Sequence, residues 1–173
     1  MQAHSTFTAL SSARRRFAAS ALTLAAATLV SGAAFAQSTV KLGFIGPISG
    51  GNAQQGLGAK NGFLLAIDQW NATPGVPFKV QGVVLDDASD PQTGVSAALK
   101  LVNDRDMVGA IGHWNSPVAL ATLPVFNRVQ MPFIVWGAIG PKITDQNFPN
   151  TTRVTPTLVN ENKPLATWAA TGL

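Results

Sequence analysis

The sequence has no cysteine and only two histidines in its 173 residues. Without cysteine no disulfide can hold the fold, so packing of apolar side chains must stabilise it. Zinc and similar ions bind clusters of Cys, His and carboxylate side chains at characteristic spacings. His4 lies in an N-terminal segment that we expect to be removed, which leaves His113 alone. The sequence therefore predicts no metal site, and His113 is expected to be hydrogen-bonded locally.

Signatures of nucleotide binding and of hydrolysis are also missing. The chain has neither a Gly-Lys-Ser/Thr phosphate loop nor a Gly-x-Ser-x-Gly nucleophile elbow, and Gly56, Gly58 and Gly62 are wrongly spaced for dinucleotide binding. Asp86 and Asp87 are neighbours on an expected strand, so their side chains point to opposite faces and cannot easily flank one substrate bond. We interpret them as a polar strand end. No catalytic residue, no enzyme activity and no cofactor are expected.

The N-terminal segment has the pattern of an export signal. Three arginines at 14–16 precede an apolar stretch over residues 17–30, and Ala34-Phe35-Ala36 resembles a cleavage site. Arg14-Arg15-x-Phe17 also fits a twin-arginine signal, so both export routes stay open. Removing the three arginines lowers the basic residues from 12 to 9 against 8 acidic ones. The basic whole-chain charge thus belongs mainly to the signal, and no nucleic-acid partner is expected.

Apolar runs and segments of helical spacing alternate through the rest of the chain. Strands alternate with helices, and the connections between strands are too long for hairpins. This pattern predicts an α/β fold with a doubly wound parallel sheet and helices on both faces. The early glycines of the first helix suggest close packing there. The expected strands are 40–45, 78–85, 107–111 and 132–135, with an extended piece at 152–155, and the expected helices are 53–70, 91–102, 116–129 and one from about 160.

Polar and aromatic residues follow the expected strand ends, where open parallel sheets bind small ligands. Ser116 has two interpretations that can coexist: its hydroxyl caps the following helix, or it joins the free N–H groups of that helix in holding a ligand carboxylate. Trp114 and Trp136 each follow a strand end and could form an apolar or stacking wall, or simply pack at the rim.

Several runs together resemble the branched-chain amino acid binding proteins of ABC importers. They are the stretch 40–50 (VKLGFIGPISG), the stretch 86–91 (DDASDP), Ile111-Gly112-His113 and the stretch 141–144 (PKIT), and the likeness extends over about 40–170. The resemblance implies a periplasmic protein of two α/β lobes that close over a small ligand. It also implies a partner, an ABC permease in the inner membrane.

The family's site residues transfer to this chain only in part. The serine that contacts the ligand carboxylate falls on Ser116, and the backbone contact after the fourth strand falls on Gly137 beside Ala138. The threonine that binds the ligand ammonium falls on Ile139, which cannot accept a proton. The family's first-loop aromatic residue falls on Gln55. The remaining expected site residues are Trp114, Asn115 and Trp136.

These departures from the family's site residues change which ligand we expect. Binding proteins of this type take amino acids, carboxylates or amides, and the loss of an ammonium partner at Ile139 disfavours leucine and valine. We therefore expect a carboxylate or amide without an α-ammonium group, with an aromatic body as one option.

Chain length predicts an incomplete version of this fold. We expect a signal peptide at 1–36, a first ligand-binding lobe at 37–150, and a hinge crossing with the first helix of a truncated second lobe at 151–173. The chain is accordingly expected to be a fragment. Two alternatives remain: a ligand-sensing receptor domain of the same fold, and a flavodoxin-like enzyme.

Overall fold

The computed structural model describes residues 37–172, so the predicted signal peptide lies outside the described residues. Each expected strand and helix is present within two residues of its predicted bounds. A short helix, α5, was not expected. The strands are β1 (Thr39–Gly46), β2 (Lys79–Asp86), β3 (Met107–Ile111), β4 (Phe133–Val135) and β5 (Thr151–Arg153), and the helices are α2 (Ala53–Ala72), α3 (Pro91–Val102), α4 (Ser116–Arg128), α5 (Lys142–Asp145) and α6 (Leu158–Thr171).

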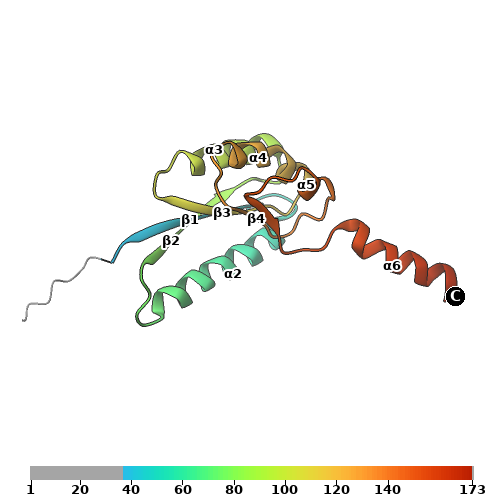
Figure 1. The fold of residues 1–173 in the computed structure, drawn as a ribbon, viewed down its shortest axis with the longest axis horizontal. Helices are drawn as coiled ribbons and strands as arrows, with labels where there is room; N and C mark the ends of the chain where they lie inside the picture. Colours follow the sequence, from blue (N-terminus) through green and yellow to red (C-terminus); the bar gives the residue numbers. More distant parts are fainter. Residues whose placement is uncertain (1–36, 173) are drawn as a thin grey trace, which may run out of the picture. The chain divides into compact units, whose positions relative to one another are not determined.

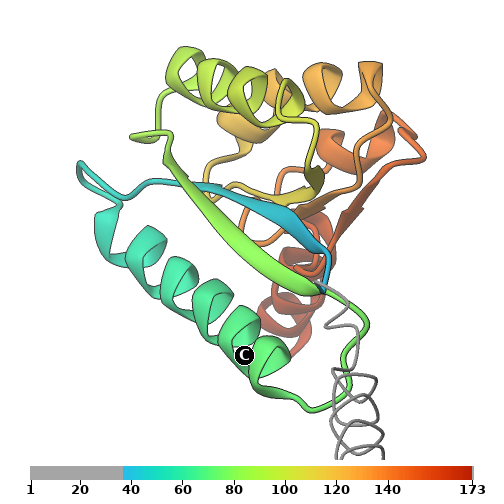
Figure 2. The ribbon, with the colours of Figure 1, turned by 90° about the vertical axis from the view of Figure 1, so that its left-hand side faces the viewer.

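The five strands form one parallel sheet in the order β2-β1-β3-β4-β5. The chain runs from β1 outward to β2, then returns past β1 to build the other half of the sheet. Helix α2 covers one face, and α3 and α4 lie on the opposite face (Figures 1 and 2). This arrangement confirms the predicted doubly wound α/β fold.

Each face of the sheet has its own apolar core. On the α2 face, Phe63 and Ile67 of the helix are buried against Phe44 and Val80 of the sheet. The first turn of α2 passes so close to the preceding loop that a Cβ at Gly56 would lie 1.8 Å from the Pro47 carbonyl oxygen. Only glycine fits there, which confirms that this helix begins in close packing.

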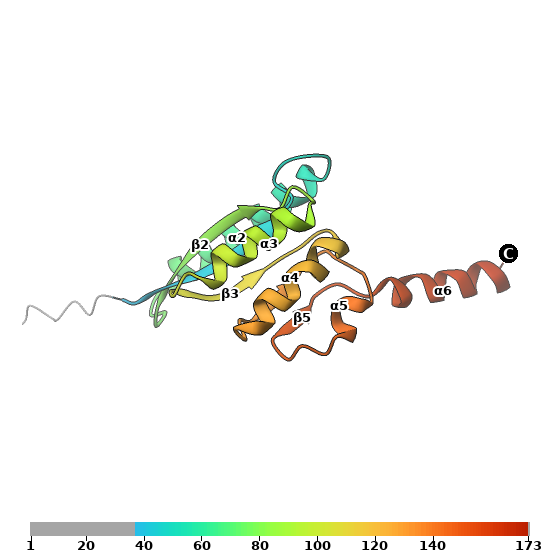
Figure 3. The same cartoon turned by 90° about the horizontal axis from the view of Figure 1, so that it is seen from above.

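On the other face, α3 and α4 lie side by side (Figure 3). Asp90 caps α3 by accepting a hydrogen bond from the Thr93 N–H at 2.7 Å, as the Asp-Pro start predicted. Phe126 of α4 stacks on Phe133 of β4 with ring centroids 4.2 Å apart. The first contact fixes the start of α3, and the second holds the last turn of α4 against the sheet.

Helix α6 differs from the other long helices because none of its described residues is buried. Leu165 and Trp168 expose 61% and 60% of their surface. No helix within residues 37–172 combines the length and the apolar character that crossing a bilayer requires.

Candidate ligand-binding site

The site lies at the carboxyl ends of β3 and β4, next to the point between β1 and β3 where the strand order reverses. The loop after β3 and the loop after β4 are hydrogen-bonded to each other through their backbones. The His113 carbonyl accepts from the Gly137 N–H at 3.2 Å and from the Ala138 N–H at 3.0 Å. The residues that follow the two strands are thereby brought to one edge, as the doubly wound fold requires.

Ser116 joins these two loops through its side chain. It is the first residue of α4, and the N-cap position belongs to Asn115, whose side chain makes no capping bond. The Ser116 hydroxyl oxygen instead accepts a hydrogen bond from the Gly140 N–H at 3.0 Å. The prediction that Ser116 caps its helix is therefore wrong. The Ser116 oxygen accepts this bond through a lone pair. Its hydroxyl hydrogen is not used in the bond and can donate to a ligand.

A cavity of about 520 Å³ opens at this edge. It contains six of the eight residues that the sequence predicted for the site, together with two residues that follow β5 and that the sequence did not indicate. The lining residues are Trp114, Asn115, Ser116, Trp136, Gly137, Ile139, Thr155 and Glu161.

Trp114 and Trp136 form one wall of the cavity. Their ring centroids are 5.6 Å apart, and Trp136 also stacks on Phe44 at 6.1 Å. A Cβ at Gly137 would lie 2.6 Å from Cε3 of Trp114, so a side chain at that position would displace the ring. The wall is thus fixed on one side by the sheet and on the other by the close approach of the loop after β4.

Two predicted site residues lie away from the cavity. Ala138 is buried beneath it, with 1% of its surface exposed. Gln55 is exposed on α2 and is not among the lining residues. Ile139 lines the cavity, and its carbonyl accepts a hydrogen bond from the Leu158 N–H at 2.9 Å, which connects α6 to the site.

His113 lies directly behind the site and is completely buried. Its Nδ1 is 2.7 Å from Asp87 Oδ2, and its Nε2 is 2.9 Å from Thr122 Oγ1. His113 is hydrogen-bonded, as expected, but its partners are not local in the sequence, because Asp87 is 26 residues and Thr122 nine residues away. Within residues 37–172 no group of three or more His, Cys, Asp or Glu side chains could hold a metal ion.

Asp86 and Asp87 bond to different groups, since Asp87 contacts His113 and the Ser89 N–H. Asp86 accepts hydrogen bonds from the N–H of Ile48 at 2.8 Å and from the N–H and hydroxyl of Ser49. Burial opposes ionisation of Asp86, but these bonds and one from the Ala88 N–H outweigh it and lower its pKa. Both carboxylates therefore have structural roles at the strand end, which agrees with our interpretation of the pair.

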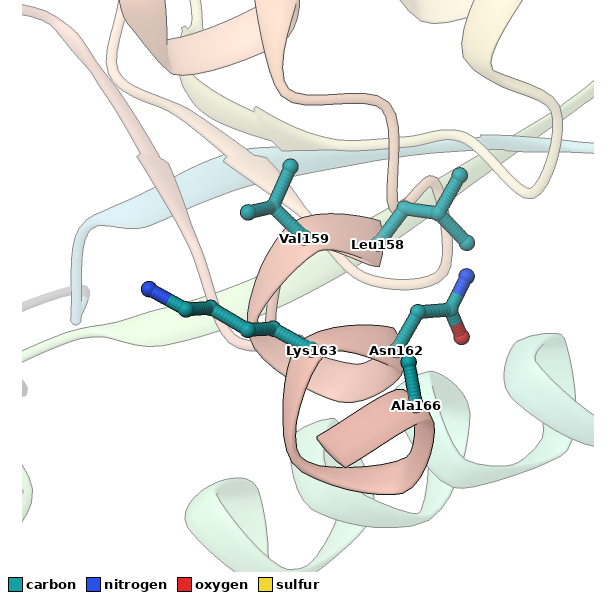
Figure 4. Close-up of a pocket in the computed structure, with 5 residues that line it drawn as sticks. All are labelled: Leu158, Val159, Asn162, Lys163 and Ala166. Carbon is teal, nitrogen blue, oxygen red and sulfur yellow. The ribbon is translucent and has the colours of Figure 1, made fainter. Parts of the chain in front are cut away.

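A second hollow, of about 430 Å³, lies along α6 and is separate from the site. All its lining residues belong to that one helix (Figure 4). It follows the exposed surface of α6 and brings together no residues from different elements.

Comparison with known proteins supports the same fold. The family described as "Periplasmic binding protein" matches residues 39–173. A Leu/Ile/Val-binding protein homologue of Brucella melitensis is 30% identical over 135 residues, which are 78% of this chain and 34% of that protein. The chain spans about a third of the length of the curated relatives that it matches.

Two solved structures extend this comparison. A leucine binding protein from Thermotoga maritima superposes with a TM-score of 0.69 at 23% identity, over 77% of this chain and 37% of that one. A solute binding protein of an ABC transporter from Rhodopseudomonas palustris, in complex with 3,4-dihydroxybenzoic acid, has a TM-score of 0.62 at 30% identity, over 70% of this chain and 33% of that one. With a family match across 39–173, a doubly wound parallel sheet and a cavity at the carboxyl ends of its strands, the chain belongs to the periplasmic binding proteins.

Proposed function

We propose that this chain is the first lobe of an exported solute-binding protein that delivers a small carboxylate or amide to an ABC permease in the inner membrane. Its relatives are solute-binding proteins and not enzymes, and the family is periplasmic. The observation that carries the proposal is the Ser116 hydroxyl, which Gly140 holds in place at the wall of the cavity.

The start of α4 supplies the donors for a ligand carboxylate. The first N–H groups of a helix have no intrahelical partner, and the helix dipole makes this end positive. At α4 these groups belong to Ser116 and Val118, since Pro117 has no N–H. Together with the Ser116 hydroxyl they form a set of donors with no basic side chain among the cavity residues. Such a set suits one carboxylate or amide oxygen.

The part of the cavity that Ile139 lines is unsuited to an α-ammonium group. Ile139 lines the cavity and has no side-chain acceptor, so an ammonium placed beside it would lose water without gaining a partner there. The tryptophan wall favours a flat apolar body. The R. palustris relative, whose bound ligand is an aromatic acid, supports this ligand class.

We extend the proposal to the organisation of the chain. Residues 37–150 would be the first ligand-binding lobe, and 151–173 the hinge crossing with the opening helix of a second lobe. The exposed surface of α6 and the chain's coverage of about a third of its relatives support this division. With one lobe, ligands would be bound on one side only, and affinities would be weak.

A direct test compares leucine with its deaminated analogue, 4-methylpentanoate, and with benzoate. Binding to the purified chain can be followed by ligand-detected NMR, which suits weak affinities. We expect benzoate and 4-methylpentanoate to bind more tightly than leucine, because leucine must desolvate its ammonium beside Ile139. In Ser116→Ala both carboxylates should bind at least fivefold more weakly, because a hydrogen bond to a charged group is lost. Tighter binding of leucine than of 4-methylpentanoate would contradict the proposed ligand class.

A further inference from the structure

We infer that Glu161 determines specificity at this site and selects an aryl carboxylate that has a hydrogen-bond donor at the end opposite its carboxylate. This inference rests on the proposed function and names the ligand class more closely. It depends on the position of one acidic side chain that the sequence did not indicate. Glu161 lines the same cavity as Ser116 and the two tryptophans.

The start of α6 is attached to the site by two hydrogen bonds. The Thr155 hydroxyl donates to the Ala138 carbonyl at 3.4 Å, and the Leu158 N–H donates to the Ile139 carbonyl at 2.9 Å. Thr157 then caps α6 by accepting from the Asn160 N–H. Glu161 follows Leu158 by three residues, or about 4.5 Å along a helix axis. Glu161 therefore lies beside the cavity, about one turn from the Ile139 loop.

Glu161 is the only residue with an ionisable side chain among those that line the cavity. Within residues 37–172 it makes no ion pair. A ligand carboxylate is repelled by Glu161 and attracted by the N–H groups at the start of α4. These two effects act together and orient the ligand, with its carboxylate at Ser116 and its opposite end towards Glu161.

The opposite end then faces the Glu161 carboxylate oxygens, which accept hydrogen bonds from a donor on the ligand. A phenolic hydroxyl or an aromatic amine provides a donor there, whereas a second carboxylate is excluded by charge. An α-ammonium cannot serve, because it sits on the carbon that bears the carboxylate and stays beside Ile139. A benzene ring between the two ends would lie against Trp114 and Trp136.

The test uses benzoate, 4-hydroxybenzoate and terephthalate with the purified chain and with Glu161→Ala. We expect the wild-type chain to bind 4-hydroxybenzoate about fivefold more tightly than benzoate, the ratio that one net hydrogen bond gives. Glu161→Ala should retain benzoate binding and lose the preference for the hydroxyl. Terephthalate should bind the variant more tightly than the wild-type chain, because the second carboxylate no longer faces a like charge.

A matched control removes an acidic charge elsewhere. Asp145→Asn changes an exposed residue of α5 that does not line the cavity, so all three affinities should stay unchanged. Glu161→Gln keeps an acceptor and removes the charge, and it should admit terephthalate while keeping part of the preference for the hydroxyl. A ratio between 4-hydroxybenzoate and benzoate that is the same in the wild-type chain and Glu161→Ala would overturn the inference. That result would leave the proposed function intact, provided that the carboxylates bind better than leucine.

Discussion

At the scale of single residues, the most consequential side chain behind the site is His113. Its Nε2 is 2.9 Å from the Thr122 hydroxyl, which is also 3.0 Å from the Ala119 carbonyl oxygen. The other ring nitrogen, Nδ1, is hydrogen-bonded to Asp87 Oδ2 at 2.7 Å. Asp87 has no exposed surface and needs this partner. The pair joins the end of β2 to the end of β3.

We therefore predict that His113→Ala lowers the free energy of unfolding by about 3–5 kcal/mol, because it leaves a buried carboxyl group without its partner. Urea denaturation of the chain measures this change. The double variant His113→Ala with Asp87→Ala should cost clearly less than the two single changes added together, since both belong to one hydrogen-bonded pair. If the losses of unfolding free energy in the two single variants added up to that of the double variant, the contact between His113 and Asp87 would contribute little to stability.

Single residues show where sequence reasoning reaches its limit. Trp114, Ser116 and Trp136 could be placed at the site because each follows a strand end, and parallel strands bring their carboxyl ends to one edge. Asp87, the partner of His113, could not be found this way, because spacing along the chain does not show which side chains at two strand ends will contact each other. Glu161 carried no signal either, since an acidic residue in the first turn of a helix is ordinary.

At the scale of elements, the order of strands and helices could be predicted because each buried strand is an apolar run between turn residues. The four-residue α5 could not, since a single turn has no period to detect. The loop after β4 was expected to contribute backbone contacts. Its hydrogen bonds to Ser116 and His113 could not be predicted, because they join residues that are distant in the sequence. This loop is the element that shapes the cavity.

Gly137→Ala tests that role, because its Cβ would lie 2.6 Å from the Trp114 ring. Trp114 is 37% exposed and can move aside, so the loss of stability should be about 1 kcal/mol, at the low end for overpacking. The near-UV circular dichroism from the tryptophan pair should change, and benzoate affinity should fall. As a control, Gly62→Ala in α2 has no atom within 4 Å of the new Cβ and should stabilise the chain by about 0.5–1 kcal/mol. An unaltered tryptophan signal in Gly137→Ala would show that this approach does not set the wall.

At the scale of the whole molecule, the two ends of the described chain differ in how they are stabilised. Residues from β1 to α4 bury side chains on both faces of the sheet, whereas α6 buries none. An isolated helix of 14 residues is marginal in water. Pro164 within α6 also removes a donor from its hydrogen-bond ladder. The α6 segment therefore gains little stability from burial within residues 37–172.

We predict that amides from Asn160 to Trp168 exchange with solvent rapidly, while those of β1, β3 and α4 are strongly protected. Hydrogen exchange measured by NMR on the monomeric chain distinguishes the two groups, with the interior of α2 as an internal standard for a stable helix. Leu165 and Trp168 lie at i and i+3, an apolar pair suited to packing on a sheet. If Asn160 to Trp168 were strongly protected in a monomer, α6 would already have a stable packing partner. It could not then be the opening helix of a lobe that is completed elsewhere, and the division of the chain at residue 150 would have to be abandoned.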